Sequence, residues 1–312
     1  MKKVALPIAV LAAVLFIGPS PIRAASAQAK ISPDAAKEIA LKEVHSESAN
    51  SEPMGISEVR RIVIVILENE DASRALRVPF LSQLASRGAL LRNFHAITHP
   101  SQPNYIALVA GNTYGVRSDS NVTLRAEHLG DLFEAKNLDW KVYAENYPGG
   151  CFLGTRSGKY VRKHVPFLSF ADVSANDVRC AAHVVDASHF DADVAQRSLP
   201  QFAMYIPNLD DDGHDTNVTT ADAWVRARFG ALLDDPRFID GTLFIVTFDE
   251  GRTFGPNVIY CALYGAGVEP GAVSDLRYDD YSLLRTVEDI FHLSTLHQRD
   301  VTASPIDGIW RQ

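Results

Sequence analysis

The sequence predicts an α/β fold, a three-layer α/β/α sandwich built around a mostly parallel central sheet. From residue 61 onward, short runs of β-branched and apolar residues alternate with helical stretches. Several of these runs are continuously apolar, as expected of parallel strands whose two faces are both covered by helices. Acidic residues directly follow three of the runs. These three observations together predict a doubly wound sheet with a polar crevice at the edge where its parallel strands end.

Six strands are expected from the runs that are rich in β-branched or aromatic residues. In chain order they cover residues 62–67, 90–97, 140–144, 202–206, 242–248 and 258–264. Helical stretches lie between them, at residues 79–87, 105–109, 129–136, 220–233 and 281–292. This alternation of strand and helix is the pattern of βαβ units, which build parallel sheets.

The chain is expected to hold one domain, over residues 59–312. That region has no internal repeat and no Pro, Gly or Ser-rich linker long enough to divide it. Residues 30–58 are polar and rich in Ala, Ser and Glu, and we interpret them as a leader or linker in front of the domain.

The first 29 residues have the pattern of a secretory signal peptide. Lys2 and Lys3 precede an apolar stretch at residues 4–17, and a series of small residues follows up to Ala29. The apolar stretch, which Pro7 interrupts, is too short to cross about 30 Å of hydrocarbon. We therefore expect an exported protein, periplasmic or extracellular, without a transmembrane segment.

Composition excludes several classes of protein and of partner. The chain has 312 residues, of which 22% are charged and 46% hydrophobic, so it is neither disordered nor low in complexity. Its formal net charge is −8, and no block of five Lys or Arg residues occurs. A nucleic acid is therefore not an expected partner.

Export would place the three cysteines in an oxidising compartment, where disulfides form. Cys151 and Cys180 lie in loop-like sequence, whereas Cys261 lies in the apolar run at residues 258–264. We favour a disulfide between Cys151 and Cys180 and a buried strand thiol at Cys261. The alternative is three free cysteines that only fill space.

Three acidic clusters follow predicted strands, at residues 68–71, 208–215 and 249–250. Because the carboxyl ends of parallel strands share one edge of a sheet, these clusters would converge. So many carboxylates in one crevice repel one another unless a cation or protons neutralise them. A bound metal ion is the simplest solution.

Ser101 is a candidate nucleophile in a second cluster, at residues 99–105. It lies near the start of a predicted helix, where free N–H groups and the helix dipole favour an anionic phosphate. A neighbouring metal could activate its hydroxyl, and the amide of Asn104 could donate to a phosphoryl oxygen. The alternative is that Ser101 only caps the helix.

Six motifs in order carry a resemblance to a known family. They are Glu68-Asn69, THPSQPNY at 98–105, YVRKHVPF at 160–167, PNLDDDGHD at 207–215, FDEG at 248–251 and YSLLRTVEDIF at 281–291. Together they resemble the phosphoesterase family of bacterial and fungal acid phosphatases and phospholipases C, in the alkaline phosphatase-like superfamily. The resemblance covers residues 60–295 and implies an alkaline phosphatase-like fold for the domain.

The resemblance also implies roles for individual residues. The metal ligands would be Glu68, Asn69, Asp249 and Glu250, and the catalytic residues Ser101, Asn104, His164 and His214. Ser101 would attack phosphorus and form a phosphoserine intermediate, while the two histidines contact the phosphoryl group or protonate the leaving oxygen. Asn208 and Asp212 would bind substrate through their shared loop. One departure is Asp280, which stands where the family commonly has a His.

The expected function is therefore that of a secreted, metal-dependent phosphoric-ester hydrolase, an acid phosphatase-like phosphomonoesterase. The cofactor would be a divalent cation, with Ca, Mg, Mn or Zn as candidates. The substrate would be a phosphorylated small molecule or a lipid head group. Two alternatives remain open: a phospholipase C-like phosphodiesterase, and a non-catalytic relative that binds metal and phosphate.

Overall fold

The computed structural model describes residues 55–252 and 254–312, and these residues belong to one compact unit. Its centre is an eight-stranded sheet with the strand order β11-β2-β10-β9-β1-β8-β4-β7. The strands of this sheet are β1 (Arg61–Leu67), β2 (Ala89–Leu91), β4 (Trp140–Ala144), β7 (Val184–Asp186), β8 (Phe202–Ile206), β9 (Thr242–Phe248), β10 (Cys261–Gly265) and β11 (Val273–Ser274). Two small sheets pair β3 (Phe94–His95) with β12 (Tyr278–Asp279) and β5 (Arg156–Ser157) with β6 (Tyr160–Val161).

The central sheet is mostly parallel, as the sequence predicts. Strand β1 pairs in parallel with both β8 and β9, and β4 pairs in parallel with β8 and β7. The exception is β10, which runs antiparallel to both β9 and β2. Strands β8 and β9 are buried along their whole length, which explains their nearly continuous apolar sequence.

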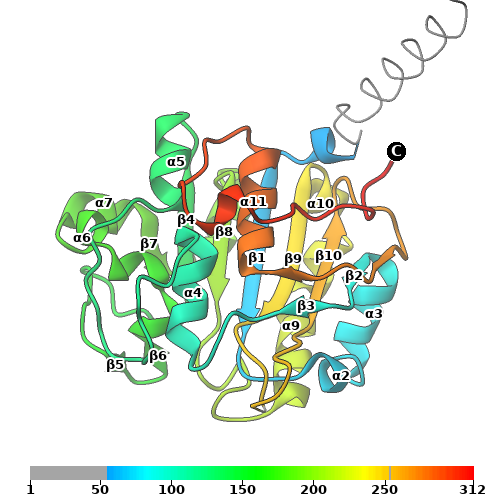
Figure 1. The fold of residues 1–312 in the computed structure, drawn as a ribbon, viewed down its shortest axis with the longest axis horizontal. Coiled ribbons are helices and arrows are strands. Elements are labelled where there is room, and N and C mark those ends of the chain that lie inside the picture. Colours follow the sequence, from blue (N-terminus) through cyan, green and yellow to red (C-terminus); the bar gives the residue numbers. More distant parts are fainter. Residues whose placement is uncertain (1–54, 253) are drawn as a thin grey trace, which may run out of the picture. The chain divides into compact units, whose positions relative to one another are not determined.

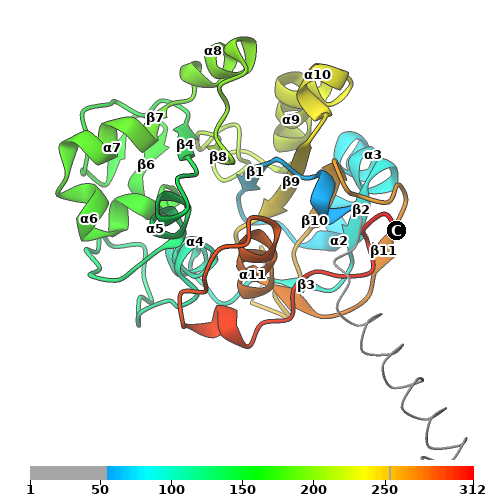
Figure 2. The same ribbon diagram turned by 90° about the horizontal axis from the view of Figure 1, so that it is seen from above.

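Helices cover both faces of this sheet, and the predicted three-layer α/β/α sandwich is confirmed (Figure 1). Figure 2 shows α8, α9 and α10 on one face, and α4, α5 and α11 on the other. The α-helices are α2 (Ala72–Ala75), α3 (Pro79–Arg87), α4 (Ser101–Ala110), α5 (Leu129–Ala135), α6 (Ala171–Ser174), α7 (Asp177–His183), α8 (Ser188–Gln196), α9 (Val218–Leu233), α10 (Pro236–Ile239) and α11 (Asp280–Ile290). Short 3₁₀ helices are η1 (Ile56–Glu58), η2 (Arg162–His164), η3 (Pro166–Ser169) and η4 (Arg299–Val301).

Most of the predicted elements are present, with two differences in the strands. The expected strand at residues 90–97 is divided between β2 and β3, which belong to different sheets. Its division follows from the partners of the backbone, since the Arg92 N–H still bonds to Ser274 whereas the Asn93 carbonyl already accepts from Tyr278. The strand expected at residues 258–264 begins later, at Cys261.

The disulfide between Cys151 and Cys180 is present, and the predicted pairing is confirmed. Cys261 is a buried free thiol in β10, also as predicted. The bridge ties the loop before β5 to helix α7 across a sequence separation of 29 residues.

Replacing both bridged cysteines with serine is expected to lower the free energy of unfolding by about 3–4 kcal/mol, because a bridge across a loop of this length restricts the unfolded chain. Urea denaturation of the variant and of the wild type checks this. Wild-type protein kept under a thiol reductant should show the same loss. An unchanged unfolding midpoint in both cases would contradict the prediction.

Glu288 of α11 is a buried carboxyl group, and among the described residues no N–H group donates to either of its oxygens. Burial, and then the neighbouring Asp300, raise the pKa of Glu288 to about 8. The folded state therefore holds this proton at pH values where the unfolded chain has lost it, so stability falls as pH rises from about 4.5 to about 8.

Glu288→Gln is expected to remove this part of the pH dependence. The change in the free energy of unfolding from wild type to variant should therefore be more favourable at pH 8 than at pH 5, by about 1–3 kcal/mol. Thermal melting of wild type and variant at both pH values measures the difference. Glu269→Gln, the same substitution at an exposed position, is the matched control. Parallel pH profiles for wild type and Glu288→Gln would show that the prediction is wrong.

Two predictions from the sequence lie outside the described residues. They are the signal peptide at residues 1–29 and the part of the leader before Gly55. The end of the leader forms η1. None of the helices in the described part of the chain is long and apolar enough to span a bilayer.

Candidate functional site

The candidate site lies where the parallel strands β1 and β9 end. The two strands are in register up to Leu67 and Phe248, so Glu68 and Asp249 leave the sheet side by side. The Glu68 N–H donates to the carbonyl of Asp212 at 3.0 Å, which joins the loop after β8 to the same edge. The structure therefore brings the three acidic clusters to one edge of the sheet.

Ser101 is the first residue of α4, and its side chain points to these carboxylates. Its Oγ lies 3.2 Å from Glu68 Oε2 and 3.5 Å from Glu250 Oε1, and it accepts from Lys163 Nζ at 3.1 Å. The N-cap position belongs to Pro100, whose side chain makes no capping hydrogen bond. Ser101 therefore does not serve as a helix cap, and its hydroxyl is available to the site.

Asn69 turns the chain between the acidic groups. It adopts a left-handed conformation with φ of 49°, which Asn tolerates better than most residues. Its backbone N–H donates to Asp249 at 3.2 Å, and its side-chain amide donates to Glu250 at 2.7 Å. Asn69 Oδ1 and Asp249 Oδ2 are buried, and neither has a hydrogen-bond partner among the described residues. These two oxygens and the carboxylates beside them suit a hard divalent cation.

The carboxyl groups of the site perturb one another. Burial raises the pKa of Asp249 well above its usual range, and the charges of Glu68 and Glu250 add to the effect. Burial also raises the pKa of Glu250, although His99 opposes the shift. Glu68 itself is held ionised, because His164 and Lys163 outweigh its burial and lower its pKa to about 2. A cation bound here would relieve the cost of ionising Asp249 and Glu250.

His164 is buried behind Glu68. Its Nε2 lies 3.0 Å from Glu68 Oε1, and its Nδ1 lies 3.6 Å from Asp212 Oδ2. The hydroxyl of Tyr105 donates to the same Glu68 oxygen at 2.6 Å. Because His164 is in contact with carboxylates on both sides, it is placed to orient Glu68.

His214 lies on the loop after β8 and faces solvent. Its Nδ1 is 2.9 Å from Asp215 Oδ1, and 38% of its side chain is exposed, against 1% for His164. Of the two predicted histidines, His214 is therefore the one that a leaving group could reach from solvent.

Two predicted site residues use their side chains elsewhere. The Asn104 amide holds the loop before α4: its oxygen accepts from the N–H groups of Ile97 and Thr98, and its nitrogen donates to the carbonyls of Thr98 and Pro100. Asn208 donates to Glu145 and Asp211 in a separate acidic cavity of about 350 Å³. The amide of Asn104 therefore holds the loop that leads into α4, and the amide of Asn208 holds the loop after β8.

Besides Tyr105, which donates to Glu68, two further residues with direct contacts in the site were not predicted. Lys163 bonds to Ser101, and His99 Nδ1 lies 2.6 Å from Glu250 Oε2. Both belong to motifs quoted above, next to His164 and two positions before Ser101. Their position in those motifs was the only signal in the sequence.

Asp280 is buried, so it does not reach bulk water. Its Oδ2 has no hydrogen-bond partner in the part of the chain that the structure describes, and the residue shares a cavity of about 10 Å³ with Asn104 and Asp249. Burial, and then Asp279, raise the pKa of Asp280 well above its usual range.

A different group of possible metal ligands lies away from Ser101. His128, Asp131 and Asp172 are the group in the described residues whose possible ligand atoms lie within 4.8 Å of one another. However, Arg179 bonds to both Asp131 and Asp172, and His128 Nδ1 accepts from the Gly130 N–H. A guanidinium thus already supplies the positive charge, and we interpret the group as an ion-pair network that holds α5, α6 and α7 together.

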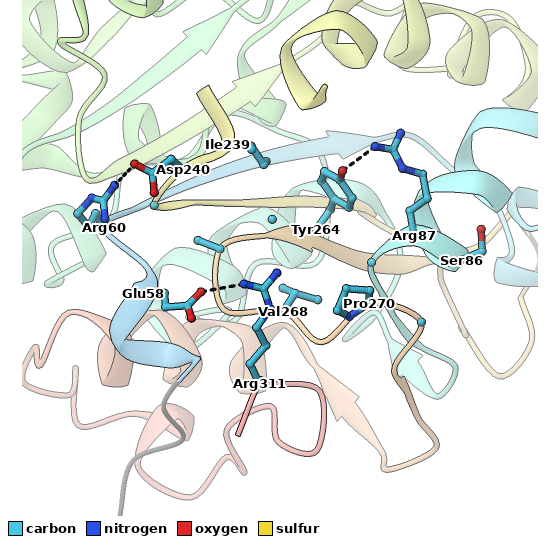
Figure 3. A pocket seen from close by; sticks show the side chains of 15 residues that line it. Glu58, Arg60, Ser86, Arg87, Ile239, Asp240, Tyr264, Val268, Pro270 and Arg311 are labelled. Atoms are coloured by element: carbon cyan, nitrogen blue, oxygen red, sulfur yellow. Dashed lines mark hydrogen bonds and ion pairs between the residues drawn. The ribbon is translucent and has the colours of Figure 1, made fainter. Parts of the chain in front are cut away.

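The structure also has a cavity of about 680 Å³ at the opposite end of the sheet (Figure 3). It lies beside the first residues of β1 and β9. Figure 3 shows Arg60 paired with Asp240, and Arg311 paired with Glu58, around this cavity. Ser101 and the acidic clusters do not line it.

Comparison with known proteins identifies the fold and the family of this chain. A protein of the alkaline phosphatase superfamily from Vibrio parahaemolyticus has the same fold, with a TM-score of 0.56 and 13% identity over 83% of this chain and 73% of its own. The profile of the Phosphoesterase family matches residues 74–294. The chain therefore belongs to the Phosphoesterase family, and the resemblance stated from the sequence is confirmed.

Two curated relatives have a similar sequence identity to this chain. A probable acid phosphatase from Kluyveromyces lactis is 36% identical over 262 residues, which is 80% of this chain. A phosphatidylinositol-3-phosphatase from Mycobacterium tuberculosis is 32% identical over 254 residues, 80% of this chain and 82% of its own length. The chain spans 62% of the length of the Kluyveromyces protein.

Proposed function

We propose that this chain is an exported, metal-dependent hydrolase of phosphoric esters, a phosphomonoesterase of acid phosphatase type. The observation that carries the proposal is the position of Ser101 Oγ, buried at the start of α4 between two carboxylates and an ammonium group. The names of the curated relatives agree with this class of reaction.

Ser101 acts as the nucleophile in this proposal. Its Oγ gives its proton to the Glu68 carboxylate, 3.2 Å away, and forms a bond to phosphorus while the ester P–O bond breaks, which leaves a phosphoserine. The leaving oxygen takes a proton from His214, whose side chain is open to solvent. His214 then accepts a proton from the water that splits the phosphoserine, Ser101 Oγ takes its proton back from Glu68, and inorganic phosphate is released. Asp212 holds the His214 loop, because its carboxylate accepts from the His214 N–H at 2.7 Å.

Glu68, Asn69, Asp249 and Glu250 would hold the divalent cation. The unpartnered oxygens of Asn69 and Asp249 support this set, as does the raised pKa of Asp249. When bound, the cation would supply positive charge for the phosphoryl oxygens and make the serine hydroxyl a stronger nucleophile. His164 and Tyr105 keep Glu68 ionised and oriented for that role.

Hydrolysis of an aryl phosphate monoester, beside the matching diester and with and without a chelator, tests the proposal. Monoester hydrolysis that needs the metal supports it. Preference for the diester would move the assignment to a phospholipase C-like phosphodiesterase. Absence of hydrolysis with metal still bound would favour a non-catalytic relative that binds metal and phosphate. The name of the mycobacterial relative suggests a phosphoinositide monophosphate as a third substrate. Comparing its hydrolysis with that of the aryl ester distinguishes a lipid head group from a small soluble ester as the preferred substrate.

A further inference from the structure

Lys163 is a partly buried cation in contact with the candidate nucleophile. It lies in η2, and only 13% of its side chain is exposed. Its Nζ donates to Ser101 Oγ at 3.1 Å and to Asp119 Oδ2 at 3.0 Å. Lysine is seldom buried to this extent unless a carboxylate is paired with it. Asp119 is that carboxylate. The pair with Asp119 therefore accounts for the limited exposure of Lys163, but it does not account for the contact with Ser101.

The surrounding structure fixes the ammonium group relative to the helix that carries Ser101. Asp119 accepts from Lys163 with one oxygen and from the backbone N–H of Gln102, in the first turn of α4, with the other. On one side of Lys163, the Arg162 guanidinium donates to three backbone carbonyls. On the other side, His164 is in contact with Glu68. Lys163 is therefore held in place before any substrate arrives.

The ammonium group keeps its charge in this position. Burial acts to lower the pKa of Lys163, but the charges of Glu68 and Asp119 outweigh it and raise that pKa. Two of the three N–H groups are used by Ser101 and Asp119, and within the described part of the chain no third acceptor contacts the remaining one. One donor is thus free to bind a further anionic oxygen.

The location of that donor suits a phosphoryl group. When phosphorus bonds to Ser101 Oγ, its non-bridging oxygens lie next to Oγ, within reach of an ammonium group 3.1 Å from the same atom. The site is otherwise rich in carboxylates, so an incoming anion is repelled in proportion to its charge. A phosphate monoester carries up to two negative charges and a diester carries one.

We propose that Lys163 binds the non-bridging phosphoryl oxygens and makes the site selective for dianionic phosphate monoesters over monoanionic diesters. The inference rests on the proposed function and specifies its substrate class. Lys163 keeps its proton throughout, and the bonds that form and break are those already described for Ser101. Asp119 is a positioning residue, since it touches Lys163 and α4 but not the phosphoryl group.

Lys163→Gln tests the proposal, with Lys163→Arg as the control that keeps the charge. For an aryl phosphate monoester, kcat/KM is expected to fall about 100-fold in Lys163→Gln, and for the matching diester by less than about 10-fold. Lys163→Arg should keep most of the preference for the monoester. An equal loss on both substrates would overturn the proposal, because it would mean that Lys163 only holds Ser101.

Equilibrium binding separates this inference from the proposed function. Calorimetry with inorganic phosphate at pH 8, where it is a dianion, should show at least about 10-fold weaker binding to Lys163→Gln than to wild type or Lys163→Arg. Dimethyl phosphate, a monoanion, should show a much smaller difference. Unchanged phosphate binding, or no phosphate binding by the wild type, would overturn the role of Lys163. If the wild type binds phosphate but hydrolyses neither ester, only the proposed function fails.

Removal of the ammonium leaves the partly exposed Asp119 carboxylate without its cation, which could disturb the first turn of α4 that Asp119 contacts. The double variant Lys163→Gln/Asp119→Asn removes both charges together. It should melt cooperatively and show the same weak phosphate binding as the single variant. Phosphate binding restored to the wild-type level in the double variant would overturn the proposal.

Discussion

Ser101→Ala is expected to lower kcat/KM for a phosphate monoester by about 10³–10⁵-fold, because it removes the atom that we propose attacks phosphorus. The fold should be unaffected. Ser101 does not cap α4, and alanine is a better helix former than serine. The free energy of unfolding is therefore expected to change by less than about 1 kcal/mol. Initial rates of aryl phosphate hydrolysis and a thermal melt of the same preparation measure the two quantities.

Ser282→Ala is a suitable control, since Ser282 is a buried serine in the first turn of another helix, α11. It should retain most of the activity. A phosphoserine trapped by rapid acid quench in the wild type, and absent from Ser101→Ala, would identify the attacking atom directly. Substantial turnover by Ser101→Ala would exclude Ser101 as the nucleophile.

The second large effect is expected at Asp249. A chelator should lower monoester hydrolysis by at least about 10²-fold in the wild type, and added divalent cation should restore it. Asp249→Asn should be inactive with or without added cation, because it replaces a buried carboxylate whose second oxygen has no partner within residues 55–252 and 254–312. The same cation should raise the melting temperature of the wild type, since a ligand that binds only the folded state stabilises it, and should raise that of Asp249→Asn much less.

Two matched controls make this result specific. Asp240→Asn removes an exposed carboxylate at the opposite end of the sheet and should behave as the wild type. Asp172→Asn removes a residue of the His128 group and should keep the cation-dependent rise in melting temperature. If Asp172→Asn loses that rise and Asp249→Asn keeps it, the cation binds in the His128 group and the proposed ligand set is wrong.

The central strands could be predicted because burial on both faces gives them a continuous apolar sequence. Strands β4, β8 and β9 have the predicted ends. Strand β7 could not be found in this way, because it has only three residues and is buried at only one of them. Helices α6 and α10 have four residues each, too few to show an apolar period.

The acidic groups and Ser101 could be predicted because each stands at a fixed place relative to a strand or a helix. The contacts of Lys163 could not, because its partners Ser101 and Asp119 are 62 and 44 residues away in the sequence. For Asn104, by contrast, the contacts that sequence reasoning missed come from residues close by in the sequence. Its type and position suited a phosphoryl contact, but carbonyls and N–H groups within seven residues bind its amide first.

The two borders of the central sheet bear on how the protein behaves at high concentration. The outermost strands, β7 and β11, have three and two residues. Short outer strands offer few free backbone N–H and C=O groups on which a strand of another molecule could add. The long, strongly apolar strands β1 and β9 lie inside the sheet, with partners on both sides. Self-association by strand addition is therefore disfavoured once the chain has folded, whereas a partly folded chain that exposes β1 or β9 would be prone to aggregate.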